Sequence, residues 1–287
     1  MPSLKDIRKR IASVKSTQKI TRAMNMVAAA KLKRAQTRIL ELRPYAHKTH
    51  EVLSSVAARA GAEEIHPLLA RREPKQVMLV VLTSDRGLCG GFNSNINRLA
   101  ERTLRRSDLG HVSLSICGRK GRDYFRRRGA DVRHEFMGVF ERLDWDQAAE
   151  IARVIVDEYG KRELDAVHLV YNEFKSAISQ KVVAEALLPI SPLPSSGDLA
   201  PVDFLYEPSK RALLDRLLPM YVETEVYRAL LESVASEHGA RMTAMDSATK
   251  NANEMIDDLT LSYNRARQAA ITKELMEIIG GAEALKG

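Results

Sequence analysis

Apolar residues recur at alternating steps of three and four through the first part of the chain, which is the pattern of a coiled-coil helix. Ser3 and Asp6 form an S-x-x-D start signal, in which each side chain can satisfy a free backbone amide of the first turn. The pattern predicts one helix over residues 3–58. Its seam positions are Leu4, Ile7, Ile11, Val14, Gln18, Thr21, Asn25, Ala28, Leu32, Ala35, Ile39, Leu42, Ala46, Thr49, Leu53 and Val56.

The middle of this seam is polar, at Gln18, Thr21 and Asn25. Polar seam positions lower the stability of a coiled coil and can fix its register. A second interpretation is that this stretch moves against a partner, where a sticky apolar surface would be a hindrance.

The last part of the chain repeats the pattern and predicts a second long helix over residues 208–285, with Pro208 in its first turn. Proline disturbs a helix interior, so Pro219 should kink this helix, and Pro44 should bend or split the first one near Arg43. The seam runs through Leu214, Leu217, Tyr221, Leu231, Ala235, His238, Met242, Met245, Thr249, Ala252, Ile256, Leu259, Tyr263, Ala266 and Ala270, with interruptions at Thr224 and Arg228.

Between the two helices, short runs rich in β-formers alternate with helical patterns. This alternation predicts an α/β domain with a largely parallel, Rossmann-like sheet, followed by a linker at Ser191–Pro201. The predicted strands are Val77–Thr83, Val112–Cys117, Asp131–Phe136, Ala166–Tyr171 and Gln180–Leu188, and the predicted helices lie near 92–107, 119–128 and Asp146–Gly160.

Neither long helix has a globular body of its own to cover its seam, so we expect the two to bury their seams against each other. Because a domain separates them in the sequence, an antiparallel pair is favoured. The C-terminal helix is longer by roughly 20 residues, about 30 Å of helix, so its end should project as an apolar tip that needs a partner. The expected division is a shaft made of residues 1–60 and 207–287, and an α/β domain at 75–205.

Composition narrows the class of protein. The chain has 287 residues, of which 45% are hydrophobic and 29% charged, which is typical of a folded domain. The longest aliphatic run, Val77–Leu82, is far short of a membrane span, and the charged N-terminus lacks the apolar core of a signal peptide. Two cysteines are too few for a disulfide framework. These features predict a protein on the reducing, cytoplasmic side.

The net charge of +8 is concentrated at the N-terminal end, where residues 1–60 hold 14 basic and 3 acidic residues. Such a block is typical of a surface that meets nucleic acid, anionic lipid or an acidic protein face, although a merely solvated helix face is also open.

No complete catalytic, cofactor or metal site is evident. The glycine-rich turn Ser84–Asn93 follows a strand and opens a helix, but it matches neither G-x-G-x-x-G nor the Walker pattern, so a tight turn is favoured over a nucleotide site. Cys89 has no local histidine to activate it and is interpreted as a structural thiol. His238 lies on the seam without a second ligand at metal spacing and is interpreted as a packed residue.

Motifs at both ends of the chain resemble one family. Arg10–Val14, Thr17–Thr21 and Met26–Ala29 are similar to the N-terminal helix of ATP synthase gamma subunits, and Arg267–Ala269 with its flanking residues is similar to their C-terminal helix. The turn Thr83–Asn93 resembles that of the family's middle domain, and Leu205-Tyr206-Glu207-Pro208 its foot. The match covers the chain from end to end, in the right order.

The resemblance implies the non-catalytic rotor shaft of an F-type ATP synthase. Its partners would be the alpha and beta subunits of the catalytic head, the epsilon subunit and the c-ring, with no nucleic acid, no cofactor and no small-molecule substrate of its own. Its place would be peripheral, on the cytoplasmic face of a bacterial inner membrane. The ion that drives rotation, the physiological direction and the rest angle of the shaft are not encoded in this chain.

The resemblance also implies roles for single residues. Contacts with the alpha/beta ring would come from Lys19, Arg22 and Met24 on the first helix and from Arg267, Gln268 and Thr272 on the last. Contacts with the c-ring and epsilon would come from Tyr206 and Glu207.

Two other classes of protein fit the sequence less well. A basic coiled-coil nucleic-acid binder would carry its basic region before the seam, whereas here the basic residues share the helix with it, and stacking aromatics are missing. A Rossmann-like enzyme with helical arms would need a phosphate motif that the chain lacks. Salt-dependent DNA binding or saturable nucleotide binding would support one or the other.

Overall fold

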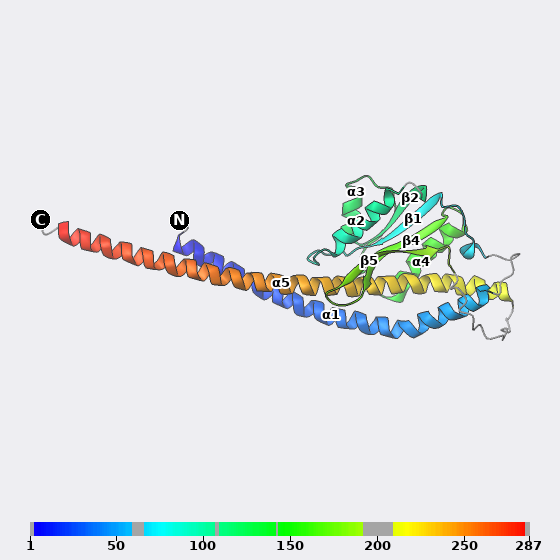
Figure 1. Cartoon of the computed structure of the whole chain (residues 1–287), viewed down its shortest axis with the longest axis horizontal. Helices are drawn as coiled ribbons and strands as arrows, with labels where there is room; N and C mark the ends of the chain where they lie inside the picture. The colour runs from blue at the N-terminus through cyan, green and yellow to red at the C-terminus, as the bar shows by residue number, and fades with distance from the viewer. Residues whose placement is uncertain (1–2, 59–65, 107–108, 142, 192–208, 285–287) are drawn as a thin grey trace. The chain divides into compact units, whose positions relative to one another are not determined.

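The computed structural model describes residues 3–58, 66–106, 109–141, 143–191 and 209–284 (Figure 1). The chain divides into two compact units: residues 1–28 together with 242–287, and residues 29–241. Helices α1 (Leu4–Ala58) and α5 (Lys210–Ala284) contribute to both units.

The two long helices confirm the periodic pattern. Every predicted seam residue whose side chain the structure describes is buried or half-buried. The predicted start signal is present, because the backbone amide of Asp6 donates to Ser3 Oγ at 3.2 Å and the Ser3 amide donates to Asp6 Oδ2 at 3.3 Å. The sequence predicts a bend or a split at Pro44. The split does not occur, because α1 is continuous through Pro44, with buried seam residues Ile39 and Leu53 on either side.

The second unit contains a five-stranded sheet in the order β3-β2-β1-β4-β5, in which only β5 is antiparallel. Its connections run in one direction from β1 to β3 and then return to β4. Since such crossovers are right-handed, α2 and α3 cover one face of the sheet and α4 covers the other. The elements are β1 (Gln76–Leu82), α2 (Phe92–Leu104), β2 (His111–Cys117), α3 (Arg119–Arg126), β3 (Val132–Phe136), α4 (Trp145–Gly160), β4 (Ala166–Phe174) and β5 (Gln180–Leu188), preceded by a short 3₁₀ turn, η1 (Pro67–Leu69).

The core of this unit lies around β1, whose residues from Val77 to Leu82 are fully buried. A strand buried on both faces reads as a continuous apolar run, which is why this segment has no alternation. Phe92, Ile96 and Ala100 form the apolar stripe of α2 that packs on the sheet.

Helix α5 is fastened to the sheet by small side chains. Ser233 Oγ donates to the carbonyl of Leu82 at 3.4 Å, and Ser236 Oγ donates to the carbonyl of Asn172 at 3.0 Å. Gly239 completes the contact, because a Cβ there would lie 3.1 Å from the carbonyl oxygen of Ala177. The glycine in the middle of this helix is therefore explained by close approach of a loop.

Candidate functional site

The carboxyl end of the sheet is the place where an open α/β domain would bind a ligand. The crevice forms where the strand order reverses, which here is between β1 and β4. In this chain α5 occupies that position, with Ser233 on the last residue of β1 and Ser236 on Asn172 of β4. The crevice is filled by the protein's own helix.

The glycine-rich turn after β1 is also filled by the chain itself. The carboxylate of Asp85 accepts the backbone N–H of Arg119, at the start of α3, at 3.1 Å, and its side chain is only 4% exposed. Thr83 Oγ1 accepts the backbone N–H of Gly121 at 2.8 Å. Within the turn, the backbone N–H of Ser84 donates to Asn93 Oδ1 at 3.0 Å. The turn is thus bonded to the chain itself, which favours the tight turn over a nucleotide site.

The candidate nucleophile and ligand residues are buried and neutral. Burial raises the pKa of Cys89 and of Cys117, so both remain thiols at neutral pH. Burial, together with the cations Arg241 and Lys31, lowers the pKa of His238 to about 4. His238 is 7% exposed, as expected for a packed seam residue, and the described residues contain no group of three or more potential metal ligands.

The first unit is a pair of helices joined by polar rungs. The polar seam positions of α1 all hydrogen-bond to α5, so they face the partner helix, and the register interpretation of the polar seam is favoured over the sliding one. A further rung closes the end of the pair, where Arg8 Nη2 donates to Tyr263 Oη at 2.7 Å. The seam rungs are Gln18 to Asn253, Thr21 to Thr249 at 2.7 Å, and Asn25 to the carbonyl of Met242 at 2.9 Å.

The Thr21–Thr249 rung gives a testable expectation. Each hydroxyl also bonds a carbonyl of its own helix, so two protons serve three contacts. Replacing either threonine with valine leaves a half-buried hydroxyl with fewer partners and should cost about 1 kcal/mol, whereas replacing both should cost less than the sum.

Native-state amide hydrogen exchange across this helix pair measures that cost, with about fivefold faster exchange expected for each single variant. Thr260→Val is the matched control, because the exposed Thr260 makes only a bond to its own helix. Additive costs in the double variant, or equal costs in the control, would contradict the rung.

The residues assigned to the alpha/beta ring do not form one cluster. Lys19 and Arg22 are exposed and Met24 is half-buried, close to the Thr21–Thr249 rung. Arg267 lies 18 residues beyond Thr249 on α5, which is about 27 Å along the helix. Arg267, Gln268 and Thr272 are all exposed, and Thr272 Oγ1 donates to the carbonyl of Gln268. Tyr206 and Glu207 lie outside the described residues.

Periodicity alone misses an exposed apolar surface on the helix pair. Ile20, Met26 and Val27 of α1 are 56–61% exposed, although they lie inside the N-terminal motifs. Large apolar side chains that gather off the seam are the signal that could have revealed them, because such surfaces mark interaction sites. The end of α5, which the sequence does predict as an apolar tip, is exposed at Ile271, Leu275, Met276, Ile278 and Ile279.

Comparisons with known proteins agree with this picture. The chain matches the family model described as ATP synthase over residues 3–285. It is 59% identical to the ATP synthase gamma chain of Anaeromyxobacter sp. (strain Fw109-5) and 56% identical to that of Sorangium cellulosum (strain So ce56), each over the full length of both chains.

Solved structures agree as well. A chain in the central stalk/c-ring structure of the Tetrahymena thermophila mitochondrial ATP synthase is 30% identical, with a TM-score of 0.62 over 80% of this chain and 99% of that one. A chain of the Euglena gracilis mitochondrial ATP synthase, at 19% identity, shares the fold, with a TM-score of 0.69 over 98% and 94% of the two chains. No described helix is long and apolar enough to cross a membrane. The chain belongs to the ATP synthase gamma chain family.

Proposed function

We propose that this chain is the non-catalytic shaft of an F-type ATP synthase, and that the helix pair of its first unit turns inside a ring of alpha and beta subunits. The single observation that carries the proposal is the helix pair itself: its seam is closed by polar rungs, and its outer surface carries the basic residues of α1 together with exposed apolar side chains. Such a surface is suited to contact with subunits that surround the helix pair. The crevice of the sheet is occupied by α5, as expected for a subunit that catalyses no reaction itself.

The chain couples ion flow to ATP chemistry by presenting different surfaces to the catalytic subunits in turn. Rotation of the c-ring carries the shaft with it, and the shaft's asymmetry stabilises a different conformation of each beta subunit. Coupling of this kind requires that the free energy of contact differ between orientations. Exposed side chains arranged unevenly around the helix pair supply that difference.

We assign the contacts as follows. Lys19 and Arg22, exposed in the basic N-terminal block, meet acidic segments of the ring, and this contact weakens with salt. Arg267, Gln268 and Thr272 make polar contacts with the catalytic subunits, and the apolar end of α5 seats in the upper bearing of the ring.

The foot completes the assignment. Tyr206 and Glu207 meet the c-ring and epsilon. The shaft consists of residues 1–60 and 207–287, with the α/β domain at 75–205 as its foot. We also propose that the chain lies peripherally on the cytoplasmic face of a bacterial inner membrane.

Affinity purification tests this function directly. The tagged chain is isolated from native membranes, and its partners are identified by mass. Alpha, beta and epsilon subunits that co-purify with ATPase activity are the expected result. Recovery of the chain alone, or with nucleic acid, would overturn the proposal.

Met24→Lys is expected to lower the coupling efficiency of the complex. The new cation would strengthen an attachment to the acidic ring segments that has to break in every turn, and even an exposed ion pair contributes up to about 1 kcal/mol. The ratio of ATP-driven proton pumping to ATP hydrolysis measures this, with Met24→Gln as the uncharged control. An unchanged ratio in Met24→Lys would refute the assigned position of Met24.

A further inference from the structure

Arg228 interrupts the predicted seam of α5, and its guanidinium reaches two strands of the sheet. Arg228 Nη2 lies 2.9 Å from Glu185 Oε2 on β5, and Arg228 Nη1 donates to Tyr171 Oη on β4 at 3.1 Å. Tyr171 Oη in turn donates to the same oxygen of Glu185 at 2.7 Å. The three side chains form a closed triangle between the helix and the sheet.

Two carboxylates of α5 hold the same guanidinium from the helix side. Arg228 Nε donates to Glu225 Oε2 at 2.9 Å, and Arg228 Nη1 donates to Glu232 Oε1 at 3.2 Å. We name these five residues, Tyr171, Glu185, Glu225, Arg228 and Glu232, the Arg228 cluster. An arginine with so many partners is fixed in orientation, because its donors lie in one rigid plane.

Most of the cluster is shielded from water. The side chains of Glu225 and Glu232 are 15% exposed and that of Arg228 is 25% exposed, whereas Glu185 is about half-exposed. Burial by itself lowers the pKa of Arg228, but Glu225, Tyr171 and Glu185 outweigh it, so the pKa is raised and the guanidinium stays charged. Burial raises the pKa of Glu232.

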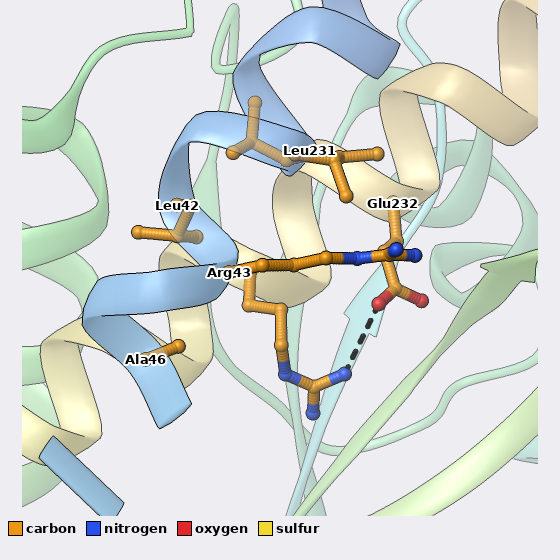
Figure 2. Close-up of a pocket in the computed structure, with 7 residues that line it drawn as sticks. Leu42, Arg43, Ala46, Leu231 and Glu232 are labelled. Atoms are coloured by element: carbon orange, nitrogen blue, oxygen red, sulfur yellow. Dashed lines mark hydrogen bonds and ion pairs between the residues drawn. The ribbon is translucent and has the colours of Figure 1, made fainter. Parts of the chain in front are cut away.

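Helix α1 packs incompletely beside this cluster. A cavity of about 110 Å³ separates Leu42, Arg43 and Ala46 of α1 from Leu231 and Glu232 of α5 (Figure 2). The second carboxylate oxygen of Glu232 is buried without a hydrogen-bond partner in the described residues. Side chains that border a void lose dispersion contacts, so at this level α5 is held by the sheet more firmly than by α1.

Ser233 and Ser236 link α5 to the strands through neutral hydrogen bonds to backbone carbonyls. Arg241 Nη2 makes a charge-assisted bond to the carbonyl of Gly87, at 3.2 Å, in the turn after β1. Within the described ranges, Arg228 to Glu185 is the ion pair that joins α5 to a strand. Charge-assisted hydrogen bonds are roughly twice as strong as neutral ones.

We propose that Arg228 is a positioning residue that fixes the angle between α5 and the α/β domain, so that torque passes between the shaft helix and the foot through the Arg228 cluster. The proposal rests on the central-stalk function and adds to it a specific joint. A joint that resists twisting needs links that fix direction as well as distance, and the planar guanidinium bound from two strands and from its own helix provides them.

The test measures rotor stiffness in the whole complex. The catalytic head is immobilised, a bead is attached to the c-ring, and the thermal spread of its angle is recorded in the resting enzyme. Arg228→Met keeps the side-chain stem and removes every donor, and Glu185→Gln removes only the strand-side charge. Both are expected to widen the spread, with the angular variance roughly doubled in Arg228→Met, while Arg228→Lys should fall between Arg228→Met and the unsubstituted enzyme.

Arg43→Met is the matched control. This variant makes the same chemical change on α1, on the other side of the cavity. No described residue pairs with Arg43, so the angular spread should equal that of the unsubstituted enzyme. The double variant Arg228→Met/Glu225→Gln separates stiffness from stability. It should recover part of the thermal stability, because the mostly buried Glu225 carboxylate is no longer left as a charge without Arg228, and it should keep the widened spread.

The outcomes distinguish a failure of the proposed joint from a failure of the central-stalk function. If the unsubstituted complex rotates and both Arg228→Met and Glu185→Gln leave the angular spread unchanged, the joint is refuted and the shaft function stands. If the chain is not part of a rotating complex at all, the central-stalk function fails. Equal widening in Arg43→Met would also overturn the joint, because the effect would then belong to charge loss in general.

Discussion

Replacing both Arg267 and Gln268 with alanine is expected to lower ATP-driven proton pumping about tenfold relative to ATP hydrolysis, with the complex still assembled. Both side chains are exposed on the part of α5 that projects beyond the Arg8–Tyr263 rung, so their removal should leave the fold intact. A hydrogen bond to a charged group contributes about 1.5–3 kcal/mol, and 1.4 kcal/mol is a factor of ten. Losing one such contact with the catalytic subunits in a single orientation is enough for the expected effect.

The measurement compares proton uptake by membrane vesicles with phosphate release in the same preparation. Arg265→Ala is the matched control, because Arg265 is exposed, carries the same charge and lies about 200° around the helix from Arg267. A ratio of pumping to hydrolysis that stays at the unsubstituted value in the double variant would remove both residues from the coupling contact. An equal loss in Arg265→Ala would mean that charge, and no specific face of α5, carries the effect.

The long helices and the strands could be predicted because each follows one short period. Steps of three and four identified the seam from Leu4 to Leu53, and the continuous apolar run at Val77–Leu82 identified the central strand. Pro44 does not split the helix. Proline removes one hydrogen bond and adds one clash locally, but buried seam residues on both sides hold the helix together.

The partners of polar residues could not be predicted from a period. Thr21 and Asn25 are visible as polar seam positions, but their partners Thr249 and Met242 depend on the register between segments more than 200 residues apart. Arg228 shows the same limit. In the pattern of its own helix Arg228 is only an interruption of the seam. Its bonding partners, Tyr171 and Glu185, come from β4 and β5 and are known only from the fold.

The candidate site, too, could be predicted from the sequence only in part. The family motifs identified which residues of the helix ends to examine, and the exposure of Lys19, Arg22, Arg267 and Gln268 is compatible with contact roles. The filled crevice of the α/β domain had only an indirect signal, the missing phosphate motif, because it depends on α5 crossing the sheet.

Gly118→Ala is expected to destabilise the protein by about 4 kcal/mol, a large cost for the addition of a single methyl group. Gly118 follows β2 with φ of +92°, and a Cβ there would lie 2.1 Å from the carbonyl oxygen of Thr83 and 2.7 Å from its carbonyl carbon. Both atoms belong to the backbone at the end of β1, so no side chain can move aside. To accept the methyl group, β1 and the start of α3 would have to separate.

Gly129→Ala gives the cost of a positive φ without a steric clash, whereas at Gly118, where ψ is 146°, the backbone conformation adds to the clash. Gly129 has a similar left-handed φ of +63°, but a Cβ there meets nothing within 4 Å, so only the backbone penalty of about 1–2 kcal/mol should appear. Urea unfolding of the full chain, followed by the fluorescence of Trp145, measures both variants. Because the end of β1 also receives Ser233 of α5, the larger loss in Gly118→Ala should loosen α5 from the sheet, seen as faster amide exchange around Ser233. Equal costs for the two alanines would show that the strands give way at Thr83 and that the close approach constrains nothing.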